Sequence, residues 1–221
     1  MITSTRRLQL PVLLAQLPQE DPSFRQALEM HSYRAGQLIA GPADLGSHLY
    51  ILMNGRARLV RRNAEGRRLV LATLEPGAIF GEGALLGGAD PETSAEAAQD
   101  CTVWALPAAH ARELAQRHPI LNWGLLQTIG KRLVQVENHL EDIAYKRLPE
   151  RLAALLLELA GGEGDLITGV SHQSLADMLG TYRETVSAIL RGFKKAGLVD
   201  LGYRRIRILD PEGLQATAGL F

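Results

Sequence analysis

Four polar side chains with directional hydrogen-bonding groups stand close together near the C-terminus. They are Tyr182, Arg183, Glu184 and Ser187, at the start of an expected helix. The guanidinium of Arg183 can donate two hydrogen bonds to a guanine, and the carboxylate of Glu184 can accept one from a cytosine amino group. These residue types at this spacing indicate direct contact with base edges.

Two short expected helices position these side chains. Ser171 is a suitable N-cap for a helix over 173–179, and Gly180 supplies a tight turn. Thr181 can then cap a second helix over 182–195. This is the helix-turn-helix pattern, in which the second helix enters the major groove; the alternative is a solvated basic helix in a bundle. The expected core between the two helices is Ala176, Leu179, Val186, Ile189 and Leu190.

Further polar and basic residues of this region suit DNA phosphates. They are Thr185, Arg191, Lys194, Lys195, Arg204 and Arg205. The segment 198–208 reads as a β-hairpin, the wing of a winged helix. The whole chain has 24 basic and 24 acidic residues, but 180–207 has seven basic and two acidic ones, a net charge of +5. The neutral total therefore does not argue against nucleic acid as a partner.

A long helix is expected over 119–145. Its apolar residues recur at alternating spacings of three and four, which is the seam of a coiled coil, and the polar residues between them leave only a narrow stripe. The stripe favours a partner helix; the alternative is packing on the chain's own barrel. The seam consists of Leu126, Ile129, Leu133, Val136, Leu140 and Ile143. Pro149 ends this helix, disfavours helical geometry at Leu148 and opens the next helix, 150–160, which a turn over 161–164 stops.

Short apolar strands separated by glycines fill residues 31–107, and 108–118 reads as a helix. Strands are expected at 48–52, 57–61, 68–74 and 102–106. Many short strands with regular turns predict a small barrel or sandwich. We therefore expect an α+β chain with three parts: a barrel domain over 1–118, a dimerisation helix over 119–145 and a DNA-binding domain over 146–221.

The composition excludes several classes of protein. Hydrophobic residues make up 46% of the 221 residues, so a largely disordered chain is excluded, and no apolar run has the length of a membrane helix. The single cysteine, Cys101, excludes an internal disulfide and reads as a buried, inert thiol. No signal peptide, membrane partner, metal site or cofactor is expected, and a cytoplasmic location fits best. There is no phosphate-binding loop, nucleophile elbow or supported carboxylate pair, so we expect no enzyme.

Four motifs in this order resemble the CRP/FNR family of bacterial transcription regulators over residues 30–210. They are the glycine-punctuated strands around Leu49-Tyr50-Ile51-Leu52, the stretch Leu74-Glu75-Pro76-Gly77-Ala78-Ile79-Phe80-Gly81-Glu82, the long helix, and Leu175-Ala176-Asp177 followed by Arg183-Glu184-Thr185-Val186-Ser187. The resemblance implies a cyclic-nucleotide-binding-type β-barrel (jelly roll), a dimerisation helix and a C-terminal winged helix-turn-helix. It also implies a homodimer on a pseudo-palindromic operator in double-stranded DNA, with RNA polymerase as a further partner.

The sequence departs from the cyclic-AMP-binding members of this family at both anchor points for the nucleotide. Aligned from Gly81 and Glu82, Glu92 and Thr93 (followed by Ser94) stand where those members carry an arginine-serine pair for the cyclic phosphate. A carboxylate at that place repels a phosphate. On the long helix, Val136 and Glu137 replace two hydroxyl residues that contact the adenine.

The effector therefore stays open. The iron–sulfur members of the family need an N-terminal cysteine cluster, which is missing, and a haem would have only His48 and Cys101 as candidate ligands. We expect a regulator that does not depend on cyclic AMP and binds DNA without an effector. The alternative is an effector-dependent regulator that binds another small molecule, or a cyclic nucleotide in a non-standard way. Ala188 stands where the family has a second base-reading arginine, so recognition there should be relaxed.

Overall fold

The computed structural model describes residues 10–88, 90–161 and 165–219 as two compact units. The first unit contains the described residues up to Glu65 and Leu71–Gln135, and the second contains Gly66–Val70 and those from Val136 onward. Of the expected turn at 161–164, only Gly161 is described; it ends a helix with a φ of 73°. The expectation of no signal peptide rests on the start of the chain, and residues 1–9 lie outside the described residues.

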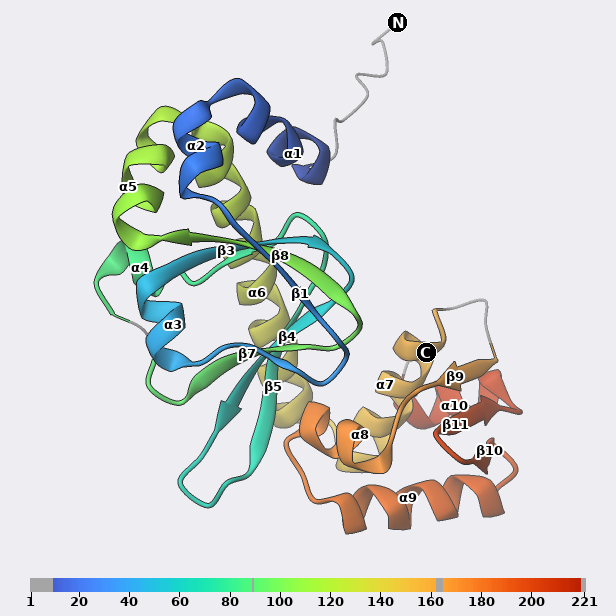
Figure 1. The fold of residues 1–221 in the computed structure, drawn as a ribbon. Helices are drawn as coiled ribbons and strands as arrows, with labels where there is room; N and C mark the ends of the chain where they lie inside the picture. The colour runs from blue at the N-terminus through green and yellow to red at the C-terminus, as the bar shows by residue number, and fades with distance from the viewer. Residues whose placement is uncertain (1–9, 89, 162–164, 220–221) are drawn as a thin grey trace, which may run out of the picture. The chain divides into compact units, whose positions relative to one another are not determined.

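The first unit is built around two four-stranded antiparallel sheets with the strand orders β1-β8-β3-β6 and β2-β7-β4-β5 (Figure 1). The strands are β1 (Glu29–Tyr33), β2 (Leu38–Ala40), β3 (His48–Asn54), β4 (Ala57–Arg62), β5 (Arg68–Leu74), β6 (Ile79–Phe80), β7 (Thr93–Ala97) and β8 (Cys101–Pro107). The four expected strands are all present, as β3, β4, β5 and β8. The expected α+β class is confirmed, and the part of the chain that contains these two sheets is called the sheet domain.

The apolar run of β3 is continuous because both of its faces are buried. Tyr50 and Leu52 join a core that also contains residues of β4 and β7, such as Leu59. Leu49 and Ile51 point to the opposite face, as alternate residues of a strand must, and join a second core. Helices supply much of this second core, so the β1-β8-β3-β6 sheet is covered on both sides.

The helices that begin in the first unit are short except for the last, α6, whose residues from Val136 onward belong to the second unit. They are α1 (Leu10–Glu20), α2 (Pro22–Ala27), α3 (Pro42–Ser47), α4 (Gly83–Leu86), α5 (Ala108–Arg117) and α6 (Pro119–Tyr145). The bounds of α6 are those expected from the sequence. Leu121, Gly124 and Thr128 are its buried residues, and Leu121 belongs to the second core of the sheet domain. No helix in the described part of the chain combines the length and apolarity needed to cross a membrane.

The second unit combines short helices with one three-stranded sheet, which has the order β10-β11-β9. Its elements are α7 (Leu148–Ala160), β9 (Leu166–Thr168), α8 (His172–Leu179), α9 (Arg183–Lys195), β10 (Val199–Gly202), β11 (Arg205–Ile208) and α10 (Pro211–Ala218). Their apolar residues form one core, which includes Leu152, Leu175, Val186, Leu190 and Leu214. The expected wing is present as the β10–β11 hairpin, and β9 adds a third strand to it.

Three helix starts differ from the expected ones, those of α7, α8 and α9. α8 begins at His172, directly after its N-cap Ser171, and not at residue 173. α7 begins at Leu148 rather than at residue 150, because Arg147 is the extended N-cap and its N–H donates to a Glu150 carboxylate oxygen (3.0 Å). α9 begins at Arg183 and not at residue 182, so Thr181 is not its cap. Thr181 instead closes the turn after α8, with its N–H donating to the Ala176 carbonyl (3.0 Å), and Tyr182 is the extended N-cap of α9.

The buried hydroxyl of Thr128 provides a test of how α6 is joined to the sheet domain. Its Oγ1 accepts the Ile79 N–H and donates to the Gly124 carbonyl, both at 2.9 Å. Thr128→Val keeps the shape but leaves a buried N–H unpaired, so we expect a loss of about 1–3 kcal/mol in the free energy of unfolding. Urea unfolding followed by tryptophan fluorescence measures it, since Trp104 and Trp123 both lie in this unit.

Thr128→Ser is the matched control. It retains the hydroxyl and removes one methyl group, so the loss should be about 1 kcal/mol or less. A Thr128→Val protein as stable as the wild type would contradict a structural role for this hydrogen bond.

Candidate nucleic-acid interface

The turn between α8 and α9 is held by backbone geometry and by one distant arginine. Ser171 is the N-cap of α8, as expected, and its Oγ accepts the Ser174 N–H (3.0 Å). Gly180 ends α8 with a φ of 66°, a conformation that other residues adopt only at a cost. Arg151 of α7 donates from Nη2 to the Leu179 carbonyl (2.9 Å), which satisfies an end carbonyl of α8. The two helices therefore meet in a fixed orientation.

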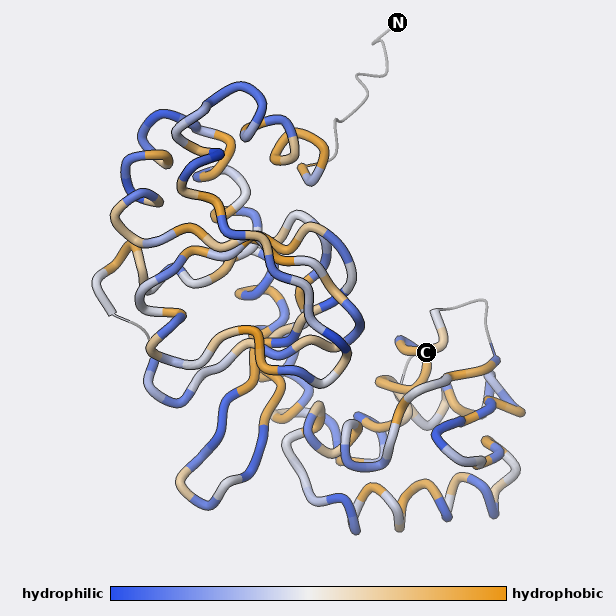
Figure 2. Tube along the Cα trace, viewed as in Figure 1, coloured by the Kyte–Doolittle hydropathy of each residue, from blue (hydrophilic) through white to orange (hydrophobic). Residues whose placement is uncertain are grey.

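α9 has one buried and one exposed face. Val186, Leu190 and Phe193 are buried at helical spacing, and apolar and polar segments alternate along α9 in Figure 2. Of the core expected between α8 and α9, four residues are buried (Ala176, Leu179, Val186 and Leu190), and Ile189 is partly buried. The exposed face starts with Arg183, Glu184 and Thr185, followed by Ala188 and Arg191.

The four residues expected to read bases lie together at the N-terminal end of α9. Arg183 and Glu184 occupy its first turn and are exposed, and the side chain of the N-cap Tyr182 is 55% exposed. Ser187 differs from the other three, because it is half-buried rather than exposed and its hydroxyl is already hydrogen-bonded. Its Oγ lies 2.8 Å from Nδ1 of His172, the first residue of α8. Sequence reasoning missed His172, because nothing in the spacing of 15 residues indicates this contact.

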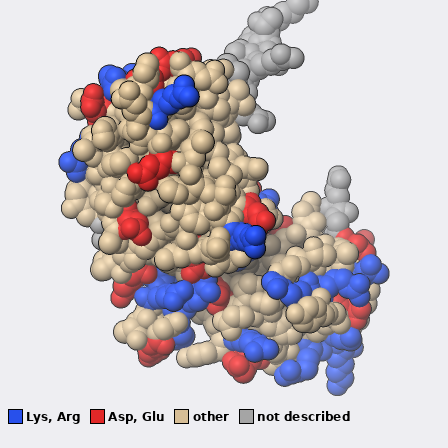
Figure 3. Space-filling model, viewed as in Figure 1, with Lys and Arg blue, Asp and Glu red and all other residues tan. Residues whose placement is uncertain are grey.

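The basic residues expected at phosphates are exposed, but they are not equally available. Lys194 donates from Nζ to an Asp200 carboxylate oxygen (2.9 Å), and this contact holds the pKa of Asp200 below its usual value. Within the described residues, Arg191 and Lys195 make no ion pair. Figure 3 shows basic side chains gathered on the second unit over the region of α9 and the wing. This surface suits a polyanion.

The wing places two further arginines at its turn. Gly202 pairs with Arg205, so Tyr203 and Arg204 form the two-residue turn. Arg204 has a φ of 49°, which is uncommon for a residue with a side chain. Its carbonyl accepts the Gly169 N–H (2.9 Å), so the turn is tied to the end of β9. Arg204 and Arg205 are both exposed.

The expected effector site contains an arginine that the linear alignment did not place there. β4 pairs with β7 so that Arg61 lies opposite Thr93. Nε of Arg61 is 2.9 Å from a Glu92 carboxylate oxygen, and its Nη1 is 3.5 Å from a carboxylate oxygen of Asp90. Hydrogen bonding to Glu92 raises the pKa of Arg61. One cation thus faces two carboxylates, and the local charge remains negative.

The other residues of this site are also engaged in contacts within the chain. Glu82, the N-cap of α4, accepts a 2.6 Å hydrogen bond from Nη1 of Arg132 on α6. Thr93 is buried and donates from Oγ1 to Asp90 (3.0 Å). Gly81 is buried and Ser94 half-buried beside these residues in the chain. Val136 and Glu137 belong to the second unit and are exposed.

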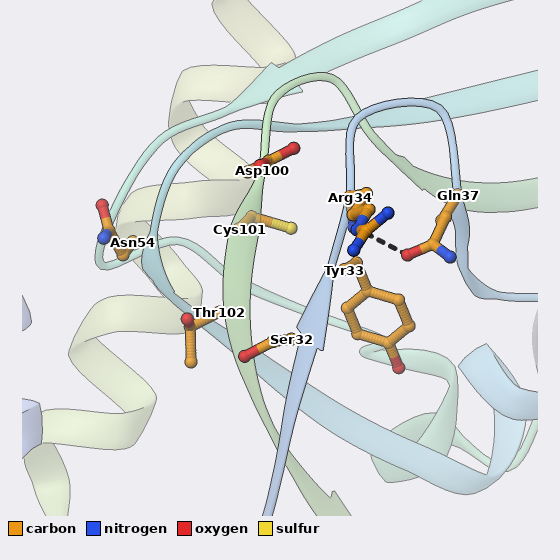
Figure 4. A pocket seen from close by; sticks show the side chains of 8 residues that line it. All are labelled: Ser32, Tyr33, Arg34, Gln37, Asn54, Asp100, Cys101 and Thr102. Atoms are coloured by element: carbon orange, nitrogen blue, oxygen red, sulfur yellow. Dashed lines mark hydrogen bonds between the residues drawn. The ribbon is translucent and has the colours of Figure 1, made fainter.

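A shallow polar hollow of about 520 Å³ lies elsewhere in the first unit, at the end of β1 and the start of β8 (Figure 4). In it, Gln37 accepts the Arg34 backbone N–H (2.6 Å) and Asp100 accepts the Ala35 N–H (2.8 Å), so its polar groups mainly hold loops. Cys101 lines this hollow but is buried, and burial raises the pKa of its thiol, in agreement with the expected inert cysteine.

His48 and Cys101 lie at opposite ends of the β3–β8 pair. His48 pairs with Pro107, whereas Cys101 starts β8, beside the partner of Asn54. Six residues of strand, or about 20 Å, separate the two ends, so these side chains do not converge on one haem.

The expected seam on α6 is exposed along its whole length. Each of its residues is between 41% and 62% exposed, whereas the buried side of α6 is formed by other residues. The seam residues are Leu126, Ile129, Leu133, Val136, Leu140 and Ile143. This apolar stripe is therefore not used to pack α6 on its own sheet domain.

Comparison with known proteins identifies both parts of the chain. Residues 30–118 match the cyclic nucleotide-binding domain, and residues 150–217 match the Crp-like helix-turn-helix domain. The chain is similar to the cyclic AMP receptor protein of Thermus thermophilus, with 31% identity over 209 residues that cover 94% of this chain and 96% of the relative.

Two further similarities extend over most of the chain. The transcriptional regulator SdrP of Thermus thermophilus is 33% identical over 201 residues, which cover 87% of this chain and 96% of that protein. A crystal structure of a CRP/FNR-family transcriptional regulator from the same organism superimposes with a TM-score of 0.72 at 32% identity, over 86% of this chain and 98% of that one. Of these relatives, one is named for cyclic AMP, so overall similarity does not identify an effector.

Proposed function

This chain belongs to the CRP/FNR family of transcription regulators, and we propose that it acts as a homodimer on a pseudo-palindromic operator without needing cyclic AMP. It is a transcription regulator with a DNA-binding helix-turn-helix. In this proposal residues 1–118 are the sensor-like domain, 119–145 the dimerisation helix and 146–221 the DNA-binding domain. RNA polymerase is the further partner that we propose, and the cytoplasm the location.

The observation that carries the DNA proposal is the exposed N-terminal end of α9. Arg183 and Glu184 project from its first turn, where a recognition helix presents side chains to the major groove. We propose that Arg183 reads a guanine and Glu184 the neighbouring cytosine, with Tyr182 and Ser187 as further base contacts. Thr185, Arg191, Lys195, Arg204 and Arg205 are the proposed phosphate contacts. Lys194 joins them only if DNA displaces Asp200.

Substitutions in α9 separate base reading from phosphate binding. Arg183→Ala should reduce the preference for the operator over unrelated DNA by roughly 5–150-fold, because it removes a bidentate contact to one base. Lys195→Ala is the matched control on the same helix. It should weaken binding to all sequences alike and lower the slope of log affinity against log salt by about one. Gel shifts over a salt series measure both quantities, and a uniform loss for Arg183→Ala would contradict its role as a base reader.

The homodimer proposal rests on the exposed seam of α6. A continuous apolar stripe at heptad spacing is self-complementary in a two-fold dimer, and large apolar residues left in water lose the stabilisation that burial provides. In this dimer, the two copies of the chain would place their α9 helices on half-sites about one helical turn of DNA apart (~34 Å).

Charge placed in the seam tests the dimer. Leu133→Glu should convert the protein to a monomer in sedimentation equilibrium and weaken binding to a two-half-site operator, because a carboxylate would be buried against its symmetry mate. Lys131→Glu, on the same helix but outside the seam, should remain dimeric. A Leu133→Glu protein that stays dimeric would rule out this interface.

The effector proposal is supported by the charges at the family's phosphate position. Asp90 and Glu92 already hold Arg61, so a cyclic phosphate would meet a site with a net negative charge. The apolar Val136 continues the seam, so α6 does not need a ligand to complete this stripe. The alternative is a different effector, or a cyclic nucleotide held in a non-standard way, in the sheet domain.

Two titrations decide between these alternatives. Freshly purified protein, shown by mass spectrometry to carry no small molecule, should bind its selected operator specifically. Isothermal titration with cyclic AMP should show no micromolar binding. Specific DNA binding that appears only after a small molecule is added would favour the effector-dependent alternative, and micromolar binding of cyclic AMP would overturn the proposal for this nucleotide.

A further inference from the structure

The hydrogen bond between His172 and Ser187 joins the first helix of the motif directly to a proposed base reader of the second. Nδ1 of His172 lies 2.8 Å from Oγ of Ser187, and both side chains are half-buried. It connects the first residue of α8 to the second turn of α9. Ser187 is also the proposed reader that is least exposed.

A serine in a helix has another partner for its hydroxyl, namely the backbone carbonyl four residues earlier. In α9 that carbonyl belongs to Arg183, and a hydroxyl turned towards it points back along the helix. The bond to His172 is an alternative to this arrangement and holds Oγ on the side of α9 that faces α8. A serine hydroxyl that is held by one hydrogen bond directs its remaining donor or acceptor sites in one direction, whereas a free hydroxyl rotates among several orientations.

We propose that His172 is a positioning residue for sequence recognition: it holds the Ser187 hydroxyl in one orientation and so sharpens the preference for the base that Ser187 contacts. This inference rests on the proposed role of α9 as the recognition helix. His172 does not itself need to touch a base. Its effect reaches the DNA through Ser187.

The surroundings of His172 suit this role. His172 directly follows Ser171, the N-cap of α8, whose Oγ accepts the Ser174 N–H. This capping hydrogen bond fixes the backbone that carries the His172 ring. Burial lowers the pKa of His172, and Arg183 and Arg191, the charged groups of α9 that act on the ring, lower it further. A neutral ring keeps one nitrogen as an acceptor and one as a donor, and either kind of nitrogen can bond to a hydroxyl.

Selection from a random DNA library tests this proposal with five proteins: the wild type, Ser187→Ala, His172→Ala, the double variant and His172→Asn. Ser187→Ala should lower the preference at one base pair of each half-site by about fivefold, the contribution of one ordinary hydrogen bond. His172→Ala should lower the preference at the same base pair, and the double variant should be no worse than Ser187→Ala. His172→Asn should restore it, because the asparagine amide offers both an acceptor and a donor at the reach of Nδ1.

Gln173→Ala is the matched control, because Gln173 is the next residue of α8 and its amide donates to Asp177 (2.8 Å) rather than to α9. It should leave the base preference unchanged. Melting curves of each variant check folding, and the rescue by His172→Asn separates positioning from general stability.

The outcomes distinguish this inference from the proposed function. A wild-type protein that selects no sequence would reject the DNA proposal itself. A wild type that selects an operator, together with a His172→Ala variant that keeps the full preference at the base pair affected by Ser187→Ala, would overturn the positioning role alone. Additive losses in the double variant would overturn it as well.

Discussion

The 27-residue α6 has apolar side chains on two faces, and the described residues of this chain cover only one of them. Leu121, Gly124 and Thr128 are buried, and the Thr128 hydroxyl joins α6 to the backbone of β6. The seam from Leu126 to Ile143 stays exposed. Because water disfavours such a stripe, a second apolar surface is needed to cover it. The proposed dimer follows from this constraint.

Electrostatics on the DNA-binding side depend on local pairing rather than on net charge. The chain as a whole is neutral, yet the region of α9 and the wing has an excess of positive charge. Asp200 reduces this excess at one point by engaging Lys194, while Arg183 and Arg191 remain directed to solvent. Of the proposed base readers, Tyr182, Arg183 and Glu184 are exposed and Ser187 is half-buried, and the proposed phosphate contacts continue from α9 to the wing.

In the sheet domain, the same kind of local pairing argues against a cyclic phosphate. The alignment from Gly81 and Glu82 accounts for Glu92, the residue before β7, but not for Arg61, which reaches Glu92 from the neighbouring strand β4. Taken alone, an arginine at this place would favour an anion. Held by Asp90 and Glu92, it neutralises charge within the chain, and Arg132 does the same for Glu82. Such pairs give the charged groups that surround the site partners within the chain.

Periodicity and capping in the sequence by themselves determined α6, the helix-turn-helix and the main strands, because these patterns are local. Local patterns were insufficient at the starts of α7 and α9, where the turn before each helix decides the first residue. Arg61 beside Glu92 and His172 beside Ser187 were decided by tertiary structure alone. The first pair is 31 residues apart and the second 15. Such contacts arise from the pairing of strands and the packing of helices, which no spacing along the chain encodes.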